Sequence, residues 1–204
     1  MVAPSSSNAA LDVGTLPEYA FGHRSVLWWA TMCMIAIEGM AFALMITSYV
    51  YIKGRLPHWP DGVPNPNLFW GTLNLIIMLV SAVPNEITKR AAERFDLAAV
   101  KLWLTVLVAF AAAFSVIRFF EFSALNVRWD TNAYGSVTWV LLGLHTVHVL
   151  TDLVDSAVLD AIMFIGPVDE HRFVDVSENS FYYYFVVLTW LPIYGVLYLA
   201  PRFV

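Results

Sequence analysis

Five long apolar stretches limit most strongly what this chain can fold into. A helix needs about 20 predominantly apolar residues to cross the hydrocarbon core of a bilayer. Five segments reach that length: residues 25–52, 68–87, 97–120, 134–165 and 181–199. None of them alternates apolar and polar residues, as the strands of a membrane barrel do. The sequence therefore predicts an all-α integral membrane bundle of five transmembrane helices.

The composition agrees with this prediction and excludes several other classes of protein. Only 13% of the residues are charged, about half the share in a soluble domain. At 59%, the hydrophobic content is too high for a disordered chain. The net charge is −5 and the basic residues are scattered, which argues against nucleic-acid binding. A single cysteine, Cys33, excludes an internal disulfide and cysteine-based zinc or iron–sulfur sites.

The chain divides into a tail and one membrane domain. Residues 1–24 are rich in Ser, Ala and Pro and predict a flexible N-terminal tail without a cleavable signal peptide. Residues 25–204 predict the five-helix domain. Short loops are expected at residues 53–67, 88–96, 121–133 and 166–180, with Pro84 breaking the second span near its end.

Basic residues give a weak indication of orientation. With the N-terminus inside, six Lys and Arg residues lie inside and five lie outside. Lys89, Arg90 and Arg94 form the densest cluster, in the loop between the second and third spans. Because short cytoplasmic loops are enriched in Lys and Arg, this cluster favours a cytoplasmic N-terminus and an external C-terminus.

Glu38 is the most informative polar residue within a span. It lies thirteen residues into the first span, where an ionised carboxylate costs several kcal/mol. Burial therefore favours its protonated form. Two interpretations stay open: a carboxylate that handles protons or anchors a lipid or helix, and a protonated carboxyl hydrogen-bonded to a neighbouring helix.

The fourth span carries the other intramembrane cluster, His145, His148, Asp152 and Asp155. At 100° per residue these four side chains fall within an arc of about 80°. They could bind a metal or make hydrogen bonds between helices. No other span contains a histidine, so we expect neither a metal nor a haem held by this chain. With a rise of about 1.5 Å per residue, Glu38 and His148 reach the same depth in antiparallel helices. A Glu38–His148 hydrogen bond is therefore predicted.

Three further polar residues are predicted to join helices. Asn74, in the middle of the second span, is expected to make a helix–helix hydrogen bond. Arg118 and Glu121, three residues apart at the end of the third span, are expected to pair at the membrane interface. The sequence contains no nucleophile–base triad, P-loop or GxGxxG motif. No catalytic residues are predicted.

Several fragments together resemble a known family. They are Ile37-Glu38-Gly39-Met40-Ala41-Phe42, His58-Trp59-Pro60, Phe119-Phe120-Glu121-Phe122, Tyr134-Gly135-Ser136, Gly143-Leu144-His145-Thr146-Val147-His148-Val149 and Phe181-Tyr182-Tyr183-Tyr184-Phe185-Val186. In order and spacing, over residues 28–199, they resemble subunit III of the haem–copper cytochrome c and quinol oxidases. The chain departs from the family pattern at Tyr184, Val187 and Asp152, which stand where the family has His, Asp and Gly. The resemblance is to a divergent five-helix bacterial-type member.

This resemblance implies a role rather than a reaction. It implies an accessory subunit III without redox centres, which packs beside the catalytic subunit and other subunits of a proton-pumping terminal oxidase. Such a subunit binds phospholipid in a cleft and supports proton uptake and stability during aerobic electron transport. Haem and copper are then expected in the partner subunits, and the location is the prokaryotic plasma membrane.

Three alternatives stay open at this point. The first is an accessory subunit of a nitric oxide reductase-type complex. The second is a small proton or ion transporter that uses Glu38 and the polar face of the fourth span. An internal inverted repeat would favour it, and none is visible. The third is a membrane enzyme with a metal at His145, His148, Asp152 and Asp155. Whether the chain itself catalyses a reaction is left open, and function inferred by resemblance is associational.

Overall fold

A computed structural model describes residues 19–60 and 62–203, and its architecture is helical throughout. The five long helices are α1 (Val26–Lys53), α2 (Leu68–Glu93), α3 (Leu97–Ser123), α4 (Ala133–Ile165) and α5 (Glu170–Tyr194). A π-helical turn (Gly195–Leu199) and a 3₁₀ turn (Ala200–Arg202) prolong α5. Each long helix is apolar enough to cross a membrane. The predicted all-α class with five membrane helices is confirmed.

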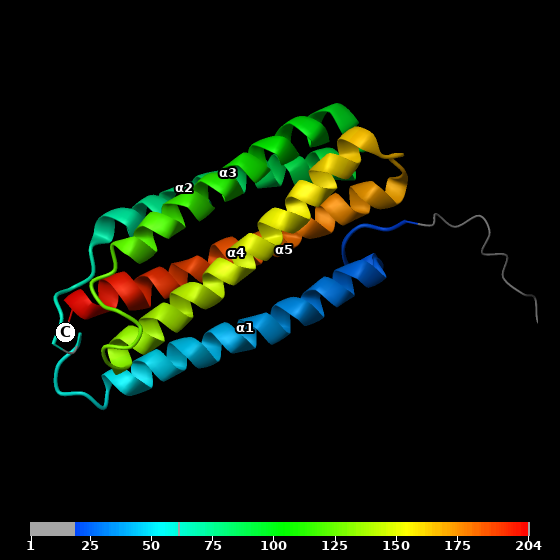
Figure 1. The fold of residues 1–204 in the computed structure, drawn as a ribbon. Coiled ribbons are helices and arrows are strands. Elements are labelled where there is room, and N and C mark those ends of the chain that lie inside the picture. Colours follow the sequence, from blue (N-terminus) through cyan, green and yellow to red (C-terminus); the bar gives the residue numbers. More distant parts are fainter. Residues whose placement is uncertain (1–18, 61, 204) are drawn as a thin grey trace, which may run out of the picture.

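The helices form a bundle with α1 at one edge (Figure 1). In that view α2 and α3 lie side by side at the other edge, and α4 and α5 lie between. α1 packs only on α4, α5 and the short turn before it among the larger contacts, whereas α5 contacts α1, α2 and α4. In the most apolar 18-residue stretch of α1, 11% of the residues are buried in the bundle, whereas the corresponding share for the last helix is 50%. α5 is therefore the central helix, and α1 leaves most of its surface open to lipid or a partner.

Each long helix begins at a side chain that caps it. The capping oxygens accept hydrogen bonds from backbone N–H groups in the first turn. The caps are Ser25, Asn67, Asp96, Asn132 and Asp169 for α1 to α5 in turn. Because the first N–H groups of a helix have no partner within it, these caps fix where each helix starts.

The second helix is longer than the sequence predicted. α2 continues through Pro84 and ends at Glu93, six residues beyond the expected end of the span. A proline inside a helix removes one backbone hydrogen bond and costs about 3 kcal/mol. The residue after the proline, Asn85, donates through Nδ2 to the Ser180 carbonyl of α5 at 2.9 Å. This bond holds α2 against α5 just beyond the proline.

The last helix starts earlier than predicted. Residues 170–180, expected in a loop, form the first turns of α5, and the prediction of a loop over 166–180 is wrong there. The Asp169 side chain accepts from the Arg172 N–H and starts the helix. Val176, Ser177, Glu178 and Asn179 are buried in the bundle. Hydropathy missed this segment because its buried face is polar.

The predicted tail also differs in its last residues. Residues 1–18 of the predicted flexible tail lie outside the described part of the chain. Tyr19 and Phe21, by contrast, pack edge-on or tilted against Phe95 at ring-centroid distances of 5.3 and 5.6 Å. Phe95 in turn contacts Phe173 at 5.2 Å. These four rings tie residues 19–21 to the α2–α3 corner and the start of α5.

Candidate functional site

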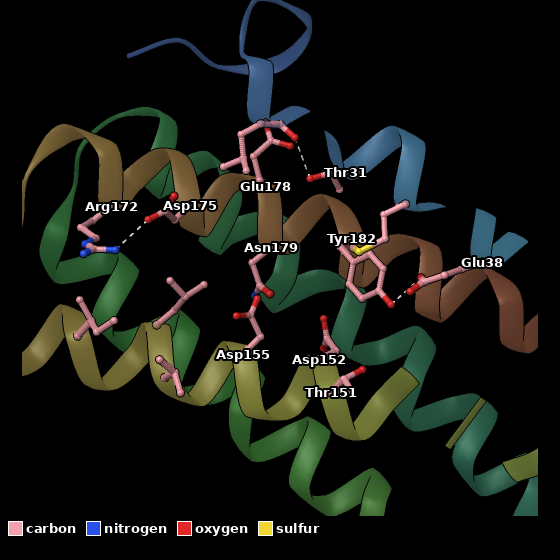
Figure 2. Close-up of a pocket in the computed structure, with 15 residues that line it drawn as sticks. Thr31, Glu38, Thr151, Asp152, Asp155, Arg172, Asp175, Glu178, Asn179 and Tyr182 are labelled. Carbon is pink, nitrogen blue, oxygen red and sulfur yellow. Dashed lines mark hydrogen bonds and ion pairs between the residues drawn. The ribbon is translucent and has the colours of Figure 1, made fainter. Parts of the chain in front are cut away.

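A polar cleft separates α1 from α4 and α5 (Figure 2). Its volume is about 660 Å³. Five carboxylates and one guanidinium line it: Glu38, Asp152, Asp155, Asp175, Glu178 and Arg172. Leu27, Met34, Val158 and Ile162 supply an apolar part of the wall. The lining of the cleft is thus partly acidic and partly apolar.

Glu38 lies at the inner end of this cleft and is held by a tyrosine. The Tyr182 hydroxyl of α5 donates to Glu38 Oε2 at 2.8 Å. His148 Nε2 is 3.8 Å from Glu38 Oε1, which is longer than a hydrogen bond. The two residues do reach the same depth, as predicted. The predicted Glu38–His148 pair is thus found as a contact within ion-pair distance, whereas the hydrogen bond to Glu38 comes from Tyr182.

His148 is oriented by its own helix. Its Nδ1 lies 2.7 Å from the Leu144 carbonyl, which can only accept, so Nδ1 carries a hydrogen. The free Nε2 then points towards Glu38. Phe42 packs on the imidazole with ring centroids 4.8 Å apart. The ring is therefore held next to the carboxyl of Glu38.

Asp152 and Asp155 lie further along the cleft. Asp152 is 2% exposed, and its Oδ1 has no hydrogen-bond partner in the described part of the chain. Figure 2 shows Asp155 beside Asn179 of α5. Asn179 Nδ2 donates to Ser156 Oγ at 2.8 Å, which leaves its Oδ1 without a partner. Both acids of α4 therefore belong to the cleft.

His145 belongs to a different site. The Arg118 guanidinium donates to its Nδ1 at 3.2 Å, and its Nε2 donates to the Val186 carbonyl at 3.1 Å. The first contact makes Nδ1 an acceptor, so the single ring hydrogen sits on Nε2. The four polar residues of α4 consequently do not act as one group. Asp152 and Asp155 line the cleft, and His148 lies beside Glu38. His145 instead contacts Arg118 of α3 and Val186 of α5.

Arg118 is the centre of this second, buried polar cluster. Its Nη1 donates to Glu121 Oε2 at 2.9 Å, with the side chains 1% and 2% exposed. Asn74 Nδ2 donates to the same oxygen at 2.5 Å, and the Tyr198 hydroxyl donates to Oε1. The predicted Arg118–Glu121 pair and Asn74 helix–helix bond are confirmed. Their location differs, because the pair is inside the bundle rather than at the membrane interface.

Aromatic rings complete the surroundings of Arg118. Its guanidinium carbon lies 4.0 Å from the centroid of Trp190 and 4.7 Å from that of Phe114. A desolvated cation over aromatic faces gains about 2 kcal/mol. The cluster joins α2, α3, α4 and α5 by fully buried bonds. It fits a structural core, since the Arg118 and Glu121 side chains are almost fully buried.

The side chains that could ligate a metal lie apart from one another in the described part of the chain. Among residues 19–60 and 62–203, no three His, Cys, Asp or Glu side chains converge on one point. Both ring nitrogens of His145 are engaged within the bundle. The described side chains therefore offer a cleft lined with separate acids rather than a coordination sphere.

Among the cleft residues that the sequence analysis did not assign to a site are Asp175, Glu178, Asn179 and Tyr182. The first three lie in the segment interpreted as a loop. Their spacing, with Tyr182, is i, i+3, i+4 and i+7, which is typical of one helix face. Asp169 as a capping residue ahead of this pattern was the available signal. Tyr198 and Trp190, which complete the buried cluster, have no such signal, because apolar spans contain many aromatic residues.

Comparisons with known proteins agree with this architecture. A profile described as Cytochrome c oxidase subunit III matches residues 59–201. A protein of Thermostichus vulcanus named cytochrome c oxidase subunit 3 is 22% identical over 187 residues, covering 91% of this chain and 93% of that protein. Proteins of the same name from Synechocystis sp. and Corynebacterium diphtheriae are each 24% identical. They cover 87% and 82% of this chain, and 77% and 85% of their own lengths. The family match spans most of the membrane domain, and the chain belongs to the cytochrome c oxidase subunit III family.

Proposed function

We propose that this chain is the accessory subunit III of a haem–copper terminal oxidase and has no redox centre of its own. The observation that carries the proposal is the family match over residues 59–201. The names of the relatives favour a cytochrome c oxidase over the nitric oxide reductase alternative. Haem and copper then belong to the partner subunits, where electrons pass to oxygen.

The two polar clusters support two parts of this role. The buried Arg118 cluster ties four helices together, which suits a subunit that stabilises a larger complex. The acidic cleft, with Glu38 at its inner end, suits a contribution to proton uptake. Phospholipid acyl chains would fit the apolar wall formed by Leu27, Met34, Val158 and Ile162. Lipid analysis of the purified complex tests that part of the proposal.

Purification of the tagged chain from its native membrane tests the assembly. We expect a larger haem-bearing membrane subunit to copurify in constant ratio, with haem and copper signals in the complex. The same chain expressed alone should show no haem absorbance. Stoichiometric haem or copper in the isolated chain would overturn the proposal. Copurification with a nitric oxide reductase catalytic subunit would favour the alternative.

Location and orientation form a separate part of the proposal. We place the chain in the prokaryotic plasma membrane with a cytoplasmic N-terminus, because Lys89, Arg90 and Arg94 gather at the α2–α3 end of the bundle. A C-terminal reporter that is active only outside the cytoplasm should be active. Activity of a cytoplasm-specific reporter at that end would contradict this orientation.

Glu38 variants test the link to proton-coupled turnover. Glu38→Gln keeps a carbonyl acceptor for the Tyr182 hydroxyl but cannot carry a proton. Glu38→Ala also removes the acceptor, at about 1–3 kcal/mol for a polar group left unpaired. We expect both variants to lower the efficiency or durability of turnover in the intact oxidase, and only Glu38→Ala to weaken assembly. Unchanged assembly and turnover in both variants would show that Glu38 contributes neither to assembly nor to proton-coupled turnover.

A further inference from the structure

The outer face of α4 carries a stripe of exposed apolar side chains. Val140, Val147 and Val154 follow one another at intervals of seven residues, and each is more than half exposed. Leu150 is also exposed and lies on the same side between the last two. Residues seven apart return to nearly the same side of a helix, which is the repeat found where two membrane helices pack at about +20°. The stripe therefore has the spacing of a surface that packs along another helix.

A groove lies along this stripe. Its volume is about 500 Å³, and it is lined by Val147, Leu150, Thr151, Val154, Asp155 and Val158. At 100° per residue, Thr151 and Asp155 are about 40° apart and form one edge of this lining, with the apolar side chains beside them. A valine in a helix has one strongly preferred rotamer, so covering this surface costs little side-chain entropy. The groove thus combines a stiff apolar floor with one polar edge.

Asp155, on the polar edge, has no partner of opposite charge in the described part of the chain. The charge that acts on it is that of Asp175 on α5, which is another carboxylate. Arg172, the guanidinium of the neighbouring cleft, pairs with Asp175 at 3.2 Å instead. By contrast Asp160, on the same helix, accepts from the Thr105 hydroxyl at 3.0 Å. Asp155 therefore needs a hydrogen-bond donor that residues 19–60 and 62–203 do not supply.

Asp155 also lies at a depth where charge is costly. α4 runs from Ala133 to Ile165, so its midpoint is residue 149. Asp155 is six residues beyond that point, about 9 Å at about 1.5 Å per residue. The hydrocarbon core extends about 15 Å to each side of the bilayer centre, so a centred α4 holds Asp155 within it. Ionisable side chains at such depths face protein or water, and the groove side of Asp155 needs a donor from whatever covers the groove.

Three kinds of occupant differ in what they offer to Asp155. Acyl chains have no hydrogen-bond donor, so they leave the carboxyl unsatisfied. A second copy of this chain, related by a two-fold axis through the groove, would bring Asp155 towards its own copy, and like charges repel. A helix of another subunit with a Lys or Arg side chain at this level supplies the missing opposite charge. Charge complementarity therefore selects the third occupant.

We propose that the groove on the outer face of α4 is the surface on which a transmembrane helix of a partner subunit docks, with a Lys or Arg side chain of that helix paired to Asp155. α1 has more open surface, but its intramembrane carboxylate, Glu38, is already bonded to Tyr182. The identity of the partner as a haem-bearing oxidase subunit rests on the proposed function. The docking face and the charge that it selects rest only on the residues of α4.

Photocrosslinking of the full chain in its native membrane tests the docking face. Benzoylphenylalanine in place of Val154 puts a photoreactive group in the groove. We expect it to crosslink to a larger partner subunit, which mass spectrometry of the crosslinked band identifies. Val116 of α3 is the matched control, because it is a valine of similar exposure at a similar distance from the midpoint of its helix. Benzoylphenylalanine at that position should form adducts with lipid only.

Variants of Asp155 test the paired charge. The amount of partner that copurifies with the tagged chain should fall roughly threefold in Asp155→Asn and roughly tenfold in Asp155→Lys, as expected for loss of one interhelical polar contact and for its reversal. Asp160→Asn is the matched control and should leave recovery unchanged, because Asp160 bonds to Thr105 of α3. Replacement of the partner's Lys or Arg near the crosslink by Glu should restore recovery with Asp155→Lys. Circular dichroism checks that each variant keeps its helices.

Crosslinking from position 154 to lipid alone, or to a second copy of this chain, would overturn the proposal. Unchanged recovery of the partner with Asp155→Lys would overturn it as well. If position 154 crosslinks to a subunit that carries no haem, the docking face stands and the proposed function fails. If a haem-bearing subunit copurifies but crosslinks only from position 116, the proposed function stands and the docking face on α4 is wrong.

Discussion

Removal of the charge of Glu121 is the most demanding test of the buried cluster. Glu121→Gln keeps one acceptor oxygen in place of two and leaves Arg118, at 1% exposure, without its anion. Breaking a buried ion pair on one side costs about 3–5 kcal/mol, because the remaining charge is uncompensated. The contacts of the guanidinium with Trp190 and His145 persist. We therefore expect a loss near the lower end, about 3 kcal/mol.

Removal of both charges should recover part of this loss. Arg118→Met with Glu121→Gln removes the buried cation as well, and replacement of whole buried pairs by neutral groups is often neutral. The double variant should therefore be more stable than Glu121→Gln alone. Unfolding in mixed micelles, followed by helix content, of the original chain, Arg118→Met, Glu121→Gln and the double variant gives the four free energies for a double-mutant cycle.

An exposed ion pair provides the control. Arg90 Nε lies 2.6 Å from Glu86 Oε1, closer than the atoms of the buried pair, but the side chains are 65% and 37% exposed. A solvent-exposed i, i+4 pair contributes about 0.3–0.5 kcal/mol, so Arg90→Met should change stability little. A cost below about 1 kcal/mol for Glu121→Gln would refute the reasoning from desolvation. The reasoning would also be refuted if the costs of Arg118→Met and Glu121→Gln simply added up in the double variant.

Two further predictions concern the packing at two glycines and a buried hydrogen bond. A Cβ at Gly71 would stand 2.6 Å from Cζ of the Tyr198 ring. Gly71→Ala should therefore lower the free energy of unfolding by about 1–3 kcal/mol. Gly143→Ala, with open space at its Cβ, should raise it by about 0.5–1 kcal/mol through helix propensity. Equal effects of the two in micelle unfolding would contradict this. Trp59 Nε1 donates to the fully buried Tyr49 hydroxyl at 2.9 Å. Trp59→Phe should then cost about 1–3 kcal/mol for the unpaired hydroxyl, and an unchanged unfolding midpoint would show that the bond is not needed.

The fold class and the candidate polar residues could be predicted from the sequence. Span length and hydropathy predicted five membrane helices. The cost of an ionisable group in a bilayer singled out Glu38, His145, His148, Asp152 and Asp155. Partners were harder to predict. Glu38 was assigned to His148 by depth alone, whereas the structure pairs it with Tyr182 at 2.8 Å. Depth fixes the level of a residue along the membrane normal but not the direction in which its side chain points.

The sequence by itself determined where apolar helices must lie, because every backbone polar group inside a bilayer needs an internal partner. Tertiary structure decided which helices touch, and with them the split between His145 in the buried cluster and His148 in the cleft. It also decided that α2 continues through Pro84 and that α5 begins at Glu170. A hydropathy pattern predicts that a membrane span ends where polar residues begin. Contacts between helices far apart in the chain can instead satisfy those residues inside it, and only the folded bundle brings those contacts together.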